Sequence, residues 1–87
     1  MEETPVKKAV EIHDEDGHQF ALLALFADGH ATICTLPPSE KDKEKAFCYT
    51  TGKAEGETMY YVAQAFLTAI RPKAKVVKLH EEEAASA

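Results

Sequence analysis

The chain has 87 residues, of which 45% are hydrophobic and 29% are charged, and its net charge is −5 from 15 acidic and 10 basic residues. This length allows one domain with a modest core, which a partner subunit would help to stabilise. The acidic balance argues against a general nucleic-acid-binding protein, because phosphate contacts need clustered lysine and arginine. It favours a soluble protein, or one that meets a basic surface on a partner.

The cellular compartment is inferred from the start of the chain and from its two cysteines. The first residues, MEETPVKK, do not have the pattern of a signal peptide. No apolar run approaches the roughly 18 residues that span a bilayer. We therefore expect a cytoplasmic protein in which Cys34 and Cys48 are small buried thiols rather than a disulfide.

The first half of the chain has the pattern of two successive hairpins. Residues 1–5 are expected to form a flexible N-terminus. Alternation predicts a first strand over 6–14, and the longest apolar run, QFALLALF at 19–26, predicts a central strand. Asp-Gly pairs on both sides of that run predict two-residue hairpin loops. A third strand over 30–36 follows and ends at Pro37 and Pro38.

In the second half of the chain, the spacing of the apolar residues changes from that of strands to that of a helix. After a charged loop, SEKDKEK, a fourth strand is predicted over 46–51. A helix beginning at 57 or 58 and stopped by Pro72 is predicted from apolar residues at helical spacing. These residues are Met59, Val62, Ala63, Phe66 and Ile70. A fifth strand over 73–79 completes a single domain of residues 6–80, and the acidic tail 81–87 is expected to be disordered. The order β-β-β-β-α-β predicts an α+β fold, an antiparallel meander with the helix on one face.

Two-residue loops would set Ile12 opposite Ala21 and Leu23 opposite Cys34. The sheet face assigned to the helix then carries Val10, Ile12, Ala21, Leu23, Leu25, Cys34 and Leu36. The other face carries Phe20, Leu22, Ala24, Phe26 and Ile33, beside Glu11 and His13. That second face is too apolar for water, and a single helix cannot cover it, so it predicts a docking surface. The alternative is cover from loops or from the C-terminal strand of the same subunit.

No catalytic, metal or cofactor site is predicted. Asp14, Glu15 and Asp16 lie near His13 and His18 in sequence, but a polar hairpin tip explains them, and no zinc-type spacing is present. No phosphate-binding glycine motif occurs. Cys48 could pair with His30 or His80, yet nothing in the sequence would orient such a pair. The chain is therefore expected not to be an enzyme.

A nucleic-acid-binding function is the alternative. Arg71, Lys73, Lys75 and Lys78 form a basic stretch within the acidic chain. Tyr60 and Tyr61 could stack on unpaired bases, which would suit a single-stranded nucleic acid. Lysines on a terminal strand are, however, also a common protection against edge-to-edge aggregation.

The sequence therefore predicts a small non-enzymatic protein-binding module. It would act as an inhibitor or adaptor, of the kind that phages and mobile elements encode, or it would form a homodimer. The predicted partner-binding residues are Phe20, Leu22, Phe26, Ile33, Asp14, Glu15 and Asp16. Further acidic candidates for a basic partner surface are Glu55, Glu57 and residues 81–83, although solubility alone explains them.

Overall fold

The computed structural model describes residues 4–35 and 47–81. The expectations for most of the N-terminus, for the loop that follows the third strand and for most of the acidic tail lie outside the described residues. The described elements are β1 (Val6–His13), β2 (Gln19–Phe26), β3 (Ala31–Thr35), β4 (Phe47–Thr50), α1 (Gly56–Ala69) and β5 (Lys75–Glu81).

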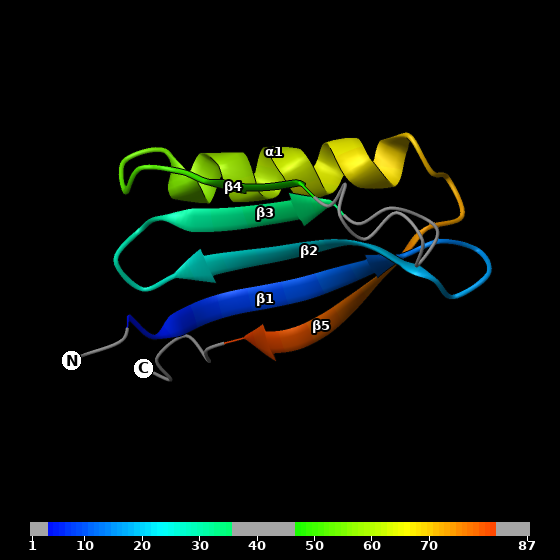
Figure 1. The fold of residues 1–87 in the computed structure, drawn as a ribbon, viewed down its shortest axis with the longest axis horizontal. Helices are drawn as coiled ribbons and strands as arrows, with labels where there is room; N and C mark the ends of the chain where they lie inside the picture. The colour runs from blue at the N-terminus through cyan, green and yellow to red at the C-terminus, as the bar shows by residue number, and fades with distance from the viewer. Residues whose placement is uncertain (1–3, 36–46, 82–87) are drawn as a thin grey trace.

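The five strands form one antiparallel sheet in the order β4-β3-β2-β1-β5. The predicted α+β meander is therefore confirmed. The apolar run forms the middle strand, and β5 returns to pair with β1, so that β4 and β5 are the two edges. α1 packs against β2 and β3, and Figure 1 shows it running along the β3–β4 side, away from β1 and β5.

The first hairpin has a three-residue loop rather than the predicted two-residue loop. The amide of Asp14 donates to the carbonyl of His18 at 2.9 Å, and the amide of Gly17 donates to the carbonyl of Asp14 at 3.0 Å. Gly17 has a φ of 84°, the left-handed conformation that closes such a loop. The extra loop residue shifts the register by one at the hairpin end.

An irregularity in β2 reverses that shift. His13 pairs with Gln19, but Ile12 pairs with Ala21, so Phe20 is the extra residue of a β-bulge. The predicted pairing of Ile12 with Ala21 is therefore confirmed, and β1 keeps its predicted faces.

The second hairpin has the same three-residue loop but no bulge to compensate for it. Leu23 pairs with Ile33, and Leu22 pairs with Cys34. The predicted pairing of Leu23 with Cys34 is wrong by one residue, and every side chain of β3 changes face. Ile33 consequently packs against the core under the helix.

The core lies between α1 and the sheet. Its buried members are Val10, Ile12, Ala21, Leu23, Leu25, Ala31, Tyr60 and Leu67. The face that α1 buries differs from the predicted one: Tyr60 is 2% exposed, whereas Phe66 is 61% exposed. Ala63 packs against the core, but Val62 and Ile70 are exposed with Phe66.

Close packing at the start of α1 explains why the helix turns Tyr60, rather than Phe66, toward the sheet. Gly56 is buried against the β2–β3 loop, where a Cβ atom would overlap the carbonyl oxygen of Gly29. This approach turns Gly56 toward the sheet. Tyr60, Ala63 and Leu67 follow it at helical spacing, so they form the buried stripe.

Candidate protein-binding surface

After its first turn, the exposed side of α1 carries no charged residue. Between Glu57 and Arg71 the helix and its C-cap contain no Asp, Glu, Lys, Arg or His. Val62, Phe66 and Ile70, spaced four residues apart, are each more than half exposed. A helix with one face against a sheet normally presents charged and polar residues on the other, so this stripe is unusual for a free surface.

β4 extends the apolar surface beyond the helix. Phe47 is 60% exposed and pairs with Thr35, and Tyr49 is 45% exposed and pairs with Ile33. Ile33 packs against the core beneath the helix. Because directly paired residues share a sheet face, Phe47 and Tyr49 lie on the helix side of the edge strand. We refer to Phe47, Tyr49, Val62, Phe66 and Ile70 together as the α1–β4 strip.

The opposite flank of α1 borders a groove that contains polar side chains. Tyr61 and Gln64 line a groove of about 150 Å³ whose other wall is formed by β1 and β5. The Lys8 ammonium donates a hydrogen bond of 2.5 Å to the Tyr61 hydroxyl, which raises the pKa of Lys8. Burial raises the pKa of Tyr60, which lines the same groove. Val62 and Phe66 project from the other side of the helix, because each residue turns the helix by about 100°.

The docking face predicted from the sequence is partly covered within the subunit. Phe20 packs against the core, and the Arg71 guanidinium carbon lies 5.0 Å from the centroid of its ring. Ile33 belongs to the helix side, which corrects its predicted placement. Phe26 stacks on His30 with ring centroids 4.3 Å apart. Phe20, Phe26, Ile33 and Leu22 are all partly buried, in contrast to the α1–β4 strip.

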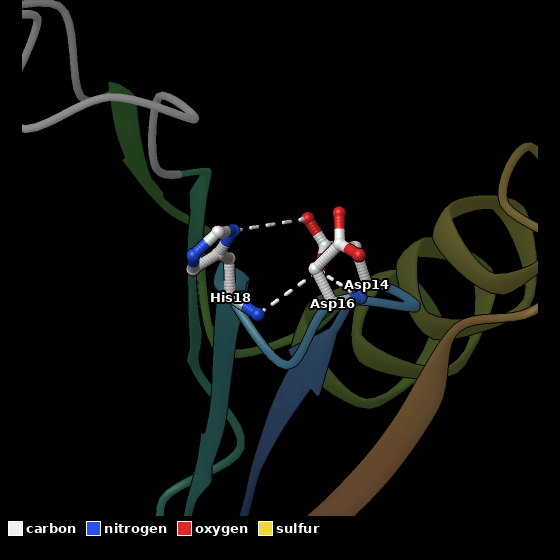
Figure 2. Close-up of side chains that lie close together, drawn as sticks. All are labelled: Asp14, Asp16 and His18. Atoms are coloured by element: carbon white, nitrogen blue, oxygen red, sulfur yellow. Dashed lines mark hydrogen bonds and ion pairs between the residues drawn. The ribbon is translucent and has the colours of Figure 1, made fainter.

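The acidic residues of the first hairpin stabilise its loop. Figure 2 shows Asp14 and Asp16 beside His18. One Asp14 carboxylate oxygen accepts the backbone amides of Asp16 and His18, both at 2.9 Å, which lowers the pKa of Asp14. Asp16 and His18 are exposed. These contacts are the ordinary side-chain bonds of a turn, and they account for the arrangement of the three residues.

The neighbouring residues Glu11, His13 and Glu15 make other contacts. His13 donates to Glu11 at 2.9 Å on the sheet surface. Glu15, from the hairpin tip, lines a hollow with Ile70 and Arg71 at the C-terminal end of α1. The hairpin tip therefore borders one end of the α1–β4 strip.

The second loop also contains an aspartate that accepts a backbone amide, but from a different position. Asp28 accepts the His30 amide at 3.0 Å and the His30 ring Nδ1–H at 2.5 Å, and these bonds lower the pKa of Asp28. Asp28 belongs to the DGH sequence of its loop, whereas Asp14 precedes DGH in the first loop, so the likeness of the two turns lies in their backbone hydrogen bonds.

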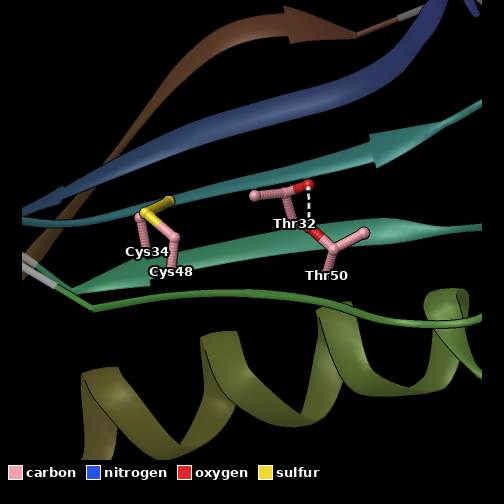
Figure 3. Close-up of a disulfide and its surroundings, with 4 residues drawn as sticks. All are labelled: Thr32, Cys34, Cys48 and Thr50. Carbon is pink, nitrogen blue, oxygen red and sulfur yellow. Dashed lines mark hydrogen bonds between the residues drawn. A yellow bond between two sulfur atoms is a disulfide. The ribbon is translucent and has the colours of Figure 1, made fainter.

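Cys34 and Cys48 form a disulfide, which corrects the expectation of two reduced thiols. The two cysteines are directly paired across β3 and β4. Figure 3 shows the disulfide with the neighbouring Thr32 and Thr50, whose hydroxyl oxygens are 3.3 Å apart. Cys48 is therefore not available as the nucleophile of a Cys–His pair.

The basic stretch of the nucleic-acid alternative does not form one surface. Lys75 pairs with His13 and Lys78 with Val10, which places these lysines on opposite faces of the sheet. Arg71 lies over Phe20, at the far end of the helix from the Lys8 groove. Lys73 lines the hollow beside Ile70. Tyr60 and Tyr61 share a groove with Lys78 alone among the four predicted basic residues.

No protein family, curated protein or solved structure matches the chain. Within residues 4–35 and 47–81, no helix has both the length and the apolar character needed to cross a membrane.

The sequence reasoning missed the α1–β4 strip because it assigned the same apolar spacing to the core. Two apolar stripes run along α1, one through Tyr60 and Leu67 and one through Val62 and Phe66. The absence of charge from 58 to 70 was the available signal, since a helix apolar on two sides needs cover on both.

Proposed function

We propose that this chain is a small non-enzymatic protein-binding module that docks through the α1–β4 strip on another protein or on itself. The observation that carries the proposal is the exposure of five large apolar side chains along one uncharged helix flank and its neighbouring edge strand. Contiguous apolar surface of this kind marks interaction sites in soluble proteins. The mechanism is burial of an apolar centre within a polar rim.

The charge of the chain would influence which partner binds. Glu15 borders the strip at the Ile70 end, and Glu55 precedes α1 at the other end. With a net charge of −5, the chain would associate fastest with a basic surface, as an inhibitor or adaptor would. A cytoplasmic location stays a prediction, and the Cys34–Cys48 disulfide is the observation against it, because disulfides persist mainly in oxidising compartments.

Capture experiments with matched variants test the proposal. The tagged chain and its Phe66→Ser variant would be used to isolate partners from cells that express the native protein. Leu79→Ser is the control, because Leu79 is similarly exposed but lies on β5. We expect Phe66→Ser to lose the associated protein and Leu79→Ser to retain it, with both variants folded. Association that is unaffected by Phe66→Ser would contradict a role for the strip.

The sheet face predicted from the sequence is tested in the same experiment. A Leu22→Ser variant changes that face without touching the α1–β4 strip. If Leu22→Ser alone abolishes association while its far-ultraviolet circular dichroism is unchanged, the partner binds the sheet face and the strip proposal is wrong.

A further inference from the structure

We infer that the α1–β4 strip is occupied by a second copy of the chain, with the two α1 helices packed antiparallel about a two-fold axis. This inference rests on the proposed function and names the partner of the same surface. A two-fold interface must be self-complementary, since each residue i that contacts residue j is matched by j contacting i. The spacing of the apolar residues of the strip and the charges at its two ends suit that requirement, and its area suits the centre of such an interface.

The first argument is the spacing of the apolar residues. In an antiparallel pair of helices, residues whose numbers add to a constant lie opposite one another. With Val62 opposite Phe66 of the second copy, the sum is 128, and Thr58 then lies opposite Ile70. The small side chains of Ala65 and Ala69, both exposed on this flank, allow the helices to approach closely.

The second argument is charge. The antiparallel register also brings Glu55, which precedes one helix, near Lys73 of the second copy, which lies in the turn that follows the other helix. Glu55 is the N-cap residue of α1, and Lys73 lies just beyond its C-terminal end, beside Ile70. Each end of the helix pair would then have one acidic and one basic residue, and the centre of the pair would be uncharged. The antiparallel arrangement also brings the positive end of each helix dipole near the negative end of the other.

The third argument is area and the lack of an obvious internal cover. About half of each strip side chain is open, which amounts to roughly 500 Å² of apolar surface if a large side chain has about 200 Å². A stable interface buries about 800 Å² on each partner, so the strip would form its centre. Within residues 4–35 and 47–81, the five side chains of the strip remain between 45% and 61% exposed.

The first test is the oligomeric state of the purified chain, measured by light scattering and sedimentation over a range of concentrations. We expect a dimer, and we expect Phe66→Ser to raise its dissociation constant at least ~100-fold, because a two-fold interface loses each contact twice. Leu79→Ser should leave the dimer intact. A monomer at all concentrations, or a dimer indifferent to Phe66→Ser, would overturn the inference.

A charge exchange tests the proposed register. Glu55→Lys alone and Lys73→Glu alone should each weaken the homodimer, and an equimolar mixture of the two variants should form a heterodimer. Glu57→Lys is the matched control: it makes the same charge change two residues away, but Glu57 lies half a turn from Phe66 on the other flank. Because Glu55 also accepts the Gly52 amide at 3.1 Å, the thermal unfolding of each variant is measured beside its mass. Failure of the mixture to restore association, with all variants folded, would contradict this register.

The outcomes separate this inference from the proposed function. A monomer that captures a different protein through Phe66 would overturn the second copy as occupant and leave the binding module in place. A monomer without any Phe66-dependent association would contradict both. A Phe66-dependent dimer supports both.

Discussion

Gly56 begins α1 with its Cα against the carbonyl oxygen of Gly29, closer than any side chain would permit. This contact joins the helix to the β2–β3 loop, although the two residues are far apart in sequence. It determines which flank of α1 meets the sheet, and it therefore leaves Val62 and Phe66 in solvent. The apolar surface on which the proposed function depends follows from a glycine on the buried face of the helix.

We predict that Gly56→Ala destabilises the protein by about 3 kcal/mol, because the new methyl group would meet backbone rather than a movable side chain. Urea unfolding followed by circular dichroism measures this change. Gly17→Ala is the comparison: Gly17 has a φ of 84° but open space around its Cα, so only the cost of a left-handed alanine applies, about 1 kcal/mol. Equal stability of the two variants would contradict this prediction, because it would show that the start of the helix adjusts to the methyl group at no greater cost than a left-handed alanine.

We predict that loss of the Cys34–Cys48 disulfide releases β4 before the rest of the sheet. All four residues of β4 are exposed, and the bridge closes a loop with a sequence separation of 14. A loop of this size corresponds to about 3 kcal/mol of stability in the chain-entropy treatment. The Cys34→Ser/Cys48→Ser double variant should therefore unfold at lower urea concentration, and its amides at 47–50 should exchange faster while those of β2 change little.

A reducing agent provides the control for this prediction. Dithiothreitol should lower the stability of the wild type to that of the double variant and leave the double variant unchanged. Equal exchange rates in β4 with and without the disulfide would contradict the expected local release.

The length of a hairpin loop accounts for the main difference between the predicted sheet and the observed one. An apolar run between two Asp-Gly pairs was sufficient to predict β2 over 19–26, the residues observed. An Asp-Gly pair indicates a turn but not its length, because it suits both a two-residue loop and a three-residue loop that ends in a left-handed glycine. That single residue reverses the faces of β3, so Ile33 instead of Cys34 pairs with Leu23 on the helix side of the sheet.

The rotation of α1 could not be obtained from periodicity either. The stripe through Val62 and Phe66 and the stripe through Tyr60 and Leu67 both have helical spacing. The choice between them is made by a tertiary contact of Gly56, and it has no local signature. The bulge at Phe20 also has no local signature, because it compensates the one-residue register shift that arises in the loop before it.

We predict that the hydroxyl of Thr51 is required at the junction between β4 and the loop before α1. Thr51 is the buried polar residue of the described chain, and its Oγ1 accepts the Ala31 amide at 2.9 Å and donates to the Gly52 carbonyl at 2.7 Å. Thr51→Val keeps the shape but leaves the Ala31 amide without an acceptor, at a cost of about 1–3 kcal/mol. Thr51→Ser keeps the hydroxyl and should lose less. Unfolding free energies of the two variants decide the point, and a Thr51→Val variant as stable as Thr51→Ser would contradict it.

We predict a loss of stability in acid that originates in the two hairpin loops. The backbone amides of His18 and His30 hold the pKa values of Asp14 and Asp28 below the ordinary value of 3.8. A carboxyl whose pKa is lower in the folded state stabilises the fold fully above its unfolded pKa. That contribution is lost as the pH falls through the lower, folded value. Melting temperature should therefore fall as the pH is reduced below about 3.8.

Asparagine variants separate this effect from general acid denaturation. Asp14→Asn and Asp28→Asn retain a side-chain oxygen that accepts the same amides, but they do not titrate. The double variant should begin less stable at neutral pH and lose less of its stability between pH ~4 and ~2. Carbon-detected NMR titration of the wild type measures the two pKa values directly. Values at or above 3.8 for both carboxyls would show that the loop hydrogen bonds do not favour the charged form.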